Sequence, residues 1–351
     1  MSYHLRIKIA KIAAIYAGTI MGAGFASGQE LTQFFVVYGN MGLVGLLLTM
    51  VLFAWLGITI LEISYTIKAT SYHQLLYYVC GKKMGTILDG VITIFLFGVL
   101  TVMLAGGGTL FRDTLHLPYS LGIALMAFSL VVTTLYGVNG IATANLIITP
   151  LLTVITTYIG IYSLNYHEWD LAMIHIPATA ADMTTSHWLL SSLLYLSYNL
   201  VMSATVLVPL GAHTSQRSVR VIGSLIGSLL LLLLAGVIIM VVMVHYPLSP
   251  EYEIPMLYIA ESQHIIHHIA YSFIFVAAMY TTGLASLYGC STKLAAVTGW
   301  SRTTALFIFI TLSIFFSYIG FTSLISTIFP LFGYATLWFI VRLLYFSFFP
   351  K

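Results

Sequence analysis

Long apolar segments alternate with short polar connections along the whole chain. A helix of about twenty residues crosses the ~30 Å hydrocarbon core of a bilayer, whereas a membrane β-strand needs about ten residues of alternating polarity. The continuously apolar segments therefore predict an all-α transmembrane protein with ten spanning helices. The expected spans lie at about 9–37, 41–67, 86–111, 119–136, 140–163, 187–210, 219–245, 265–290, 303–320 and 322–349.

The first of these segments has an unusual polar centre. At 1.5 Å per residue it would extend for about 43 Å, well beyond the hydrocarbon core. Its middle reads Gly22-Ala23-Gly24-Phe25-Ala26-Ser27-Gly28-Gln29-Glu30. Such residues suit a helix that is broken at membrane depth, which is tolerated only where the free backbone groups line a cavity inside the protein. We expect the first span to be discontinuous.

Composition and charge support a polytopic membrane protein. The 351 residues are 60% hydrophobic and only 7% charged, whereas soluble domains are about one quarter charged. Ten helices with the N-terminus inside leave only Arg112 of the 13 basic residues on the outer side, as the positive-inside rule requires. We expect a cell-membrane protein with both termini cytoplasmic. The bilayer is a predicted partner and nucleic acid is not, and the two cysteines indicate no disulfide framework.

Ten helices divide into two halves of five within a single domain, residues 1–351. The halves cover about 9–163 and 187–349, and they have opposite orientation because five is odd. Helix 6 would then correspond to helix 1. Its centre carries Tyr195, Ser197, Tyr198 and Asn199, and Pro209 follows, which predicts a second break. Interrupted helices at matching positions of two halves indicate a transporter binding site.

The chemistry of the first break suits a zwitterionic or anionic cargo. Backbone N–H groups at the start of a half-helix attract a carboxylate, which would meet the amides of Ala23, Gly24 and Phe25 beside Gly22. The alternative is tight helix packing through small residues, which explains Gly22 and Gly28 but not the polar residues that follow.

Other candidate site residues lie near the two breaks. If helices 1 and 6 pack together, aromatic and polar side chains converge there, namely Tyr16, Phe25, Tyr195, Tyr198 and Asn199. Glu30 is the only acidic residue deep in an apolar segment, which makes it a candidate gate or proton-titrating group. A structural carboxylate bonded to a neighbouring helix is an equally good interpretation.

The sequence around the break resembles a known group of transporters. Gly22-Ala23-Gly24-Phe25 is similar to the Gly-Ala/Ser-Gly break in helix 1 of the amino acid–polyamine–organocation superfamily. The ten-helix plan resembles the LeuT fold of neurotransmitter:sodium symporters. The longer string through Glu30 is most similar to YkvI-like bacterial membrane proteins. The resemblance implies a 5+5 inverted repeat with helices 1 and 6 discontinuous.

The resemblance extends to a sodium site. Ala278-Met279-Tyr280-Thr281-Thr282 in helix 8 is similar to the Ala-x-x-Thr-Ser segment that binds Na⁺ in the symporters. It implies a five-oxygen shell. The shell consists of the carbonyls of Gly18, Met21 and Ala278 and the hydroxyls of Thr281 and Thr282. The alternative is that both hydroxyls bond back to their own helix.

Three further groups have simpler interpretations. Glu62 and Asp89 are expected to pair with Lys68 and with the adjacent Lys82 and Lys83. A short helix is expected at 256–262 in an outer loop. A cluster of Glu261, His264, His267 and His268 has helical spacing that could bind a metal, but we interpret it as an interfacial histidine cluster.

Two functions fit these expectations. The first is secondary active transport of a small amino-acid-like substrate by alternating access, coupled to Na⁺ in preference to H⁺. The second is a non-transporting sensor that keeps the pocket, as in germinant receptors. No nucleophile–base pair or metal-ligand set lies at membrane depth, so we predict neither an enzyme nor a cofactor beyond the coupling ion.

Overall fold

The fold is helical in every part of the chain that the structure, a computed structural model, describes: residues 3–69, 71–136, 141–166, 185–246 and 252–349. The helices are α1 (Tyr3–Ile20), α2 (Ala23–Ser27), α3 (Gln29–Phe34), the 3₁₀ turn η1 (Val36–Tyr38), α4 (Asn40–Ile67), α5 (Tyr72–Cys80), α6 (Lys82–Asp113), α7 (Tyr119–Tyr136), α8 (Ile141–Tyr166), α9 (Trp188–His213), α10 (Arg217–Val244), α11 (Pro255–Gln263), α12 (Ile265–Thr298), α13 (Arg302–Ser317) and α14 (Phe321–Phe348).

Seven of the described helices are long and apolar enough to cross a bilayer, namely α4, α6, α8, α9, α10, α12 and α14. The helices α7 and α13 are apolar but shorter. Large apolar side chains such as Phe128, Phe273 and Phe315 stay exposed, which suits a surface that faces lipid tails. The expected segments are thus all helical, with ends that differ from the predicted ends by a few residues in most cases.

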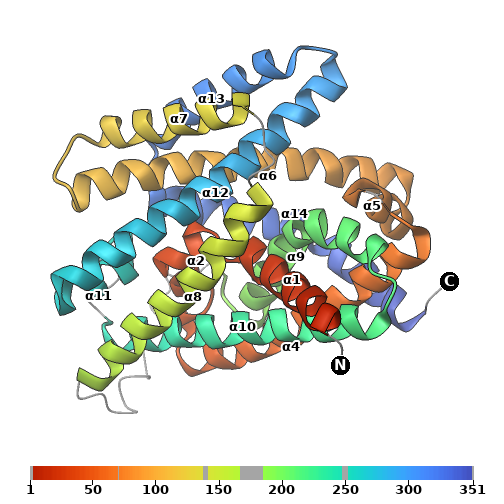
Figure 1. The fold of residues 1–351 in the computed structure, drawn as a ribbon, viewed down its shortest axis with the longest axis horizontal. Coiled ribbons are helices and arrows are strands. Elements are labelled where there is room, and N and C mark those ends of the chain that lie inside the picture. Colours follow the sequence, from red (N-terminus) through yellow and green to blue (C-terminus); the bar gives the residue numbers. More distant parts are fainter. Residues whose placement is uncertain (1–2, 70, 137–140, 167–184, 247–251, 350–351) are drawn as a thin grey trace.

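The helices pack in two main groups. In the first, α1 and α4 both pack on α10, and α4 also packs on α9. In the second, α6 lies against α7, α12 and α13. Figure 1 shows the second group along the upper side of the view and the first group along the lower side. The helix α14 contacts both α9 and α6, and α8 contacts α1, α10 and α12.

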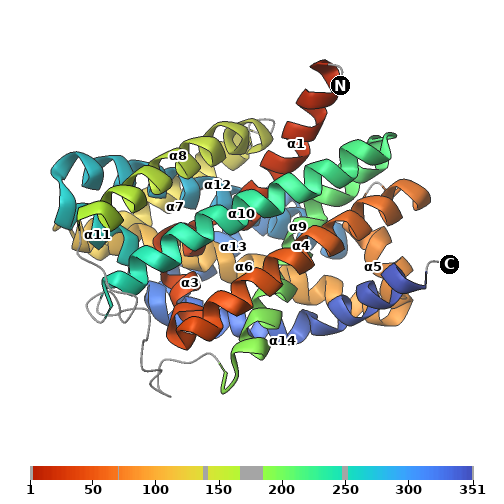
Figure 2. The ribbon, with the colours of Figure 1, turned by 90° about the horizontal axis from the view of Figure 1, so that it is seen from below.

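The two ends of the molecule carry different short helices. In Figures 1 and 2 both chain termini lie at the same end, together with α5, and α11 lies at the opposite end. The helix α11 confirms the short helix expected at 256–262. The helix α5 was not expected, because its nine residues include polar side chains and are too short to stand out as an apolar segment.

The first apolar segment is divided rather than continuous. The helix α1 ends at Ile20 and α2 begins at Ala23. A second interruption occurs at Gly28, where φ is +80°, a left-handed conformation that glycine adopts without steric cost. The helix α3 therefore starts in a new direction after one residue.

Helix 6 differs from the expectation, because α9 is uninterrupted from Trp188 to His213. The prediction of a second break there is wrong. Its polar residues hydrogen-bond within the helix: Asn199 Nδ2 donates to the Tyr195 carbonyl at 3.1 Å and Ser203 Oγ donates to the Asn199 carbonyl at 2.7 Å. Polar side chains satisfied in this way do not interrupt a helix. Pro209 is accommodated inside it.

Candidate functional site

The break in the first segment leaves backbone groups without helical partners. Gly22 has extended dihedrals, φ −78° and ψ −176°. The Met21 N–H still bonds to the Ala17 carbonyl at 2.9 Å, but the Gly22 N–H turns back to Ile20 at 2.8 Å, and regular bonding resumes only at Ala26. The N–H groups of Ala23, Gly24 and Phe25 form the first turn of α2, so they have no partner within that helix.

The long helix α12 lies along the break. Thr282 is the nearest side chain to Gly22, with Oγ1 3.7 Å from the place where a Cβ would be. Further along α12, Tyr271 donates a hydrogen bond to the Ala26 carbonyl at 2.5 Å. Through Thr282 and Tyr271, α12 therefore contacts the residues at both ends of the short α2 and positions the break.

Glu30 is buried and points back toward the break. Only 4% of Glu30 is exposed. Tyr198 donates a short hydrogen bond to Oε1, and Asn199 Nδ2 lies 3.4 Å from the same oxygen. The other oxygen, Oε2, lies 2.5 Å from the position of a Cβ on Gly24. Among the described residues no cationic side chain forms an ion pair with Glu30. The carboxylate thus joins α3 to α9 beside α2.

Aromatic rings cover the side of the break that faces α3 and α9. Tyr195 packs against Phe34, Phe35 and Phe53 with ring centroids 4.9 to 6.2 Å apart. Tyr198 stacks on a ring of α14, Phe329, at 5.2 Å and 12°. All of these rings are buried. They close the protein on this side of the break.

A cavity approaches the break from the opposite side. It measures about 1050 Å³ and is lined by side chains of α1, α5, α6, α9 and α12. Gly18, Thr19 and Thr282 line it next to the break, and Lys8 and Lys11 line it near the start of α1. The cavity therefore extends from the end of the molecule that carries α5 and the N-terminus to Gly18 and Thr282 beside the break, and aromatic rings cover the break on the other side.

The structure brings the predicted substrate residues together only in part. Gly24 and Asn199 lie close to the Glu30 carboxylate, as does Tyr198. Phe25 is fully buried. Tyr16 lies away from the break, because its hydroxyl donates to the Phe53 carbonyl at 2.7 Å in α4. The Tyr195 hydroxyl is buried and finds no hydrogen-bond partner among the described residues.

The predicted cation ligands come from the residues at the end of α1 and from α12, the helix that carries Thr282 next to Gly22. Met21, Ala278 and Thr281 are buried, while Gly18 and Thr282 line the cavity. Thr281 Oγ1 lies 3.2 Å from both the Ala277 and Ala278 carbonyls, so in this structure its hydroxyl bonds back to its own helix.

Sequence reasoning missed a hydroxyl of α8. Thr149 is buried, and its Oγ1 lies 2.3 Å from the position of a Cβ on Gly18. The side chain therefore faces the Gly18 backbone directly. The available signal was a hydroxyl residue immediately before Pro150, a proline that leaves one backbone carbonyl of the helix without its helical partner.

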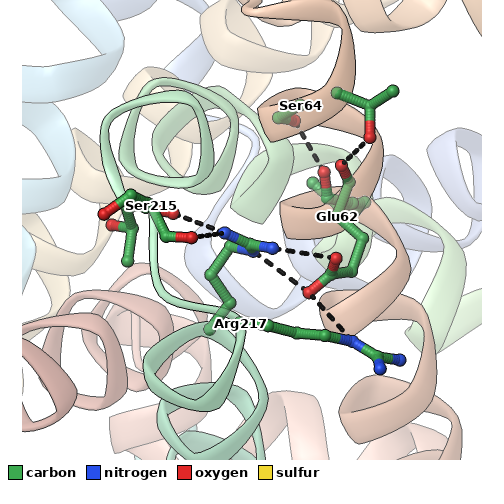
Figure 3. Close-up of polar contacts among 8 residues, drawn as sticks. Glu62, Ser64, Ser215 and Arg217 are labelled. Atoms are coloured by element: carbon green, nitrogen blue, oxygen red, sulfur yellow. Dashed lines mark hydrogen bonds and ion pairs between the residues drawn. The ribbon is translucent and has the colours of Figure 1, made fainter.

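Two acidic residues at the α5 end have partners other than those expected. Glu62 of α4 accepts two hydrogen bonds from Arg220, at 3.0 and 2.9 Å, and Arg217 lies 3.9 Å away. Figure 3 shows Glu62 and Arg217 in this cluster of polar contacts, with Ser215 nearby. Asp89 of α6 is bonded by Lys293 of α12 and by Tyr72 at 3.0 Å. The predicted pairs with nearby lysines are wrong, because helix packing brings more distant cations closer.

The outer histidines have local structural contacts. His264 Nδ1 accepts the Ile266 N–H at 3.2 Å as the N-cap of α12. His267 Nδ1 lies 3.0 Å from Gln263 Oε1, and its ring packs edge-on against Tyr162. In the part of the chain that is described, no group of three or more His, Cys, Asp or Glu side chains is arranged to hold a metal ion.

Comparison with known proteins places the chain in a family. No family model matches it. Over 344 residues it is 32% identical to the uncharacterized membrane protein YkvI of Bacillus subtilis (strain 168), with 95% of this chain and 94% of that protein covered. The chain belongs to the YkvI family. The uncharacterized protein YyaD of the same organism is 26% identical over 336 residues. Together with the apolar helices, this makes the chain a multi-pass membrane protein.

Solved structures of LeuT-fold transporters share the fold of this YkvI-family chain. MhsT in complex with L-phenylalanine aligns with a TM-score of 0.62 at 18% identity, covering 96% of this chain and 95% of MhsT. A Na⁺-coupled sialic acid symporter aligns at 0.63 and 14% identity, covering 98% and 79%. The inward-facing conformation of Mhp1 aligns at 0.59 and 14%, covering 88% and 69%. Identities this low establish a common fold.

Proposed function

We propose that this YkvI-family protein is a secondary active transporter of a small amino-acid-like solute, coupled to Na⁺ in preference to H⁺. The observation that carries the proposal is the path to the break. A cavity of about 1050 Å³ extends from one end of the molecule to Thr282, the side chain next to Gly22, while buried aromatic rings cover the other side. A site with access from one side at a time is what alternating access requires.

The proposal includes a membrane topology, which the distribution of basic residues supports. The chain would cross the membrane ten times as two inverted halves of five helices, with α1 to α3 together forming the first crossing. The positive-inside rule places the termini and α5 in the cytoplasm. The cavity then opens to the cytoplasm, and the structure corresponds to an inward-open state.

The proposed substrate site lies at α2 and the facing turn of α9. Its members would be Gly22, Ala23, Gly24 and Phe25, with Tyr198 and Asn199 opposite. The unpaired amides of α2 would bind a carboxylate of the solute. That MhsT was solved with L-phenylalanine supports a solute of this kind on this fold.

The proposed Na⁺ site lies one turn closer to the cavity. Carbonyls of Gly18, Met21 and Ala278 and hydroxyls of Thr281 and Thr282 would supply oxygen ligands, which suit a hard cation. The Thr149 hydroxyl beside Gly18 is an additional candidate. Glu30 would act as a gate that holds α3 to α9, and it is the group that would titrate if the coupling ion were a proton.

Uptake into reconstituted vesicles tests the proposal. Uptake of a mixture of labelled amino acids and related acids would be measured in vesicles with no ion gradient, with a Na⁺ gradient or with a pH gradient across the membrane. We expect accumulation that follows the Na⁺ gradient, and loss of this dependence in Thr282→Ala. Thr298→Ala, in an exposed hydroxyl of the same helix, is the matched control.

Three other outcomes would change the proposal in different ways. Accumulation that follows only the pH gradient and is lost in Glu30→Gln would make the proton the coupling ion. Saturable binding without accumulation under any gradient would favour the sensor function. Neither binding nor uptake of any offered solute, in protein that remains folded, would count against both.

A further inference from the structure

The cavity that leads to the break has an unbalanced charge. Its lining includes three lysines: Lys8 and Lys11 of α1 and Lys293 of α12. No Asp or Glu lines it among the described residues. The two histidines of the lining, His73 and His213, add no negative charge in either protonation state.

One carboxylate, that of Asp89, is buried behind the cavity lining and balances the charge of a single lysine. Asp89 is 4% exposed and is bonded by Lys293 and by the Tyr72 hydroxyl. His73 Nδ1 lies 2.7 Å from its Oδ1. With the charge of Asp89 satisfied by Lys293, the charges of Lys8 and Lys11 remain without a carboxylate partner on the wall. Both are exposed, and no ion pair to either occurs among the described residues.

The wall between the lysines and the break carries hydroxyl groups. Thr282, Ser286, Gly289 and Lys293 line the cavity at spacings of four, three and four residues, so they lie along one face of α12. The Ser286 hydroxyl is buried, with 1% of the residue exposed, and it has no hydrogen-bond partner among the described residues. An unsatisfied donor of this kind is available to a polar solute in the cavity.

Topology alone does not explain this arrangement. The positive-inside rule accounts for lysines at this end of the molecule, and Lys82 and Lys83 are exposed there without lining the cavity. The rule makes no demand on carboxylates, because acidic residues contribute little to it. A cavity wall with several cations and no acidic side chain is therefore a property of the passage itself.

We propose that the cavity is an anion-selective vestibule, and that the solute which passes through it carries a net negative charge. This inference rests on the proposed transport function and narrows its substrate class to small carboxylic acids whose negative charges exceed their positive ones. Walls of low dielectric constant focus the field of one-signed charges and raise the local concentration of oppositely charged solutes by about tenfold or more. Cations, including free amines, are depleted in the same passage.

Charged thiol reagents test the vestibule without knowledge of the cargo. Ala285 lines the cavity and is exposed within it. Ala285→Cys, in a background of Cys80→Ser and Cys290→Ser, would be reacted with an anionic sulfonatoethyl and a cationic trimethylammonioethyl methanethiosulfonate. The ratio of the two rate constants, normalised to that of free 2-mercaptoethanol, measures the local preference for an anion. We expect a ratio of about ten in low salt, smaller at 0.5 M NaCl because ions screen the lysines.

Matched lysine variants assign the preference to residues. Lys8→Gln with Lys11→Gln is expected to lower the normalised ratio by at least threefold, whereas Lys82→Gln with Lys83→Gln, which removes the same charge from the same end, leaves it unchanged. A normalised ratio of one or below at Ala285→Cys overturns the proposal. An equal decrease in both double variants overturns it too, because the field would then belong to the whole surface.

Competition during uptake tests the substrate class. Glutamate, glutamine and lysine, which are similar in length and differ in net charge, would compete for whatever solute the vesicles accumulate. Stronger competition by glutamate, weakened about tenfold in Lys8→Gln with Lys11→Gln, supports the inference. If glutamine or lysine inhibits uptake more strongly than glutamate does, the inference about substrate charge is overturned, although the proposed transport function stands. If the vesicles accumulate nothing, transport itself fails, and the reagent ratio still decides the charge of the vestibule.

Discussion

The Glu30 carboxylate occupies the space that a side chain at Gly24 would need. Its Oε2 lies 2.5 Å from the position of a Cβ on Gly24, and Phe329 lies 3.1 Å from the same point. The contact is made across the second interruption of the first segment, between α2 and α3. The absence of a side chain at Gly24 is therefore what allows the only acidic residue of this segment to approach the proposed substrate site.

Gly24→Ala is expected to displace this carboxylate and abolish uptake. Overpacking of a buried site typically costs about 1 to 3 kcal/mol, so the thermal midpoint in detergent should fall by several degrees. Gly236→Ala in α10 is the control, because a Cβ there meets nothing within 4 Å. Wild-type uptake in Gly24→Ala would show that Glu30 does not depend on this space.

Tyr198→Phe is expected to destabilise the protein where Tyr195→Phe does not. The Tyr198 hydroxyl donates to Glu30, and its loss leaves a buried carboxylate oxygen with only the long contact to Asn199. Hydrogen bonds to charged groups contribute about 1.5 to 3 kcal/mol. The Tyr195 hydroxyl is buried without a partner, so its removal costs little. Thermal midpoints of the two variants measure the difference, and equal effects would contradict the assigned hydrogen bond.

Arg220→Gln is expected to be among the most destabilising single changes outside the site. The Arg220 side chain is 3% exposed, bonds Glu62 through two nitrogens and donates to the Thr214 and Ser215 carbonyls at 2.5 and 3.0 Å. Removing one partner of a fully buried ion pair costs about 3 to 5 kcal/mol, and because the Glu62 side chain is 30% exposed we expect a cost below that range.

Arg217→Gln is the control for this variant, because its side chain is 80% exposed and lies 3.9 Å from Glu62. Exposed pairs contribute about 1 kcal/mol or less. Thermal midpoints measured side by side should differ by several degrees, with Arg220→Gln the lower. Similar midpoints for the two variants would mean that Glu62 does not depend on Arg220.

Protonation of His73 is expected to lower the stability of the folded protein at acidic pH. Burial lowers the pKa of His73, and nearby Lys293 adds to the lowering, against the opposing effect of Asp89. The folded protein therefore binds fewer protons than the unfolded chain. Its stability is complete above the unfolded value of about 6.5 and is lost as the pH falls through the lower folded pKa. Midpoints measured from pH 8 to 5 should decline less in His73→Gln. Parallel curves for both proteins would exclude His73 as the cause.

The lengths of the continuously apolar segments predicted the helices well, because each span must be apolar over a length that the bilayer fixes. They could not predict α5, whose nine residues lie outside that constraint. The pattern of polar residues also overstated the interruption of helix 6. In the first segment three glycines coincide with the interruptions, whereas Asn199 and Ser203 bond to carbonyls of their own helix and leave α9 intact. Polar composition indicates a buried site, and backbone freedom decides whether a helix breaks there.

The candidate site was predictable where the family resemblance covers both partners and less so where other helices meet. The resemblance implied that Thr282 lies near the residues at the end of α1, and Thr282 does lie next to Gly22. The contact of Thr149 with Gly18 depends on how α8 crosses α1, which no local pattern encodes. The same holds for Asp89, whose cation comes from α12, 204 residues along the chain. Long-range packing, rather than propensity, sets these pairs.

The size of the cavity has a pharmacological consequence. Its volume of about 1050 Å³ lies at the upper end of the range in which drug-sized molecules bind proteins, about 300 to 1,000 Å³. If the chain transports a solute as proposed, a rigid compound that filled the cavity would hold α1 apart from α6 and α12 and arrest the proposed transport cycle. Such an inhibitor would need to match the shape of the cavity and would not need to resemble the proposed solute.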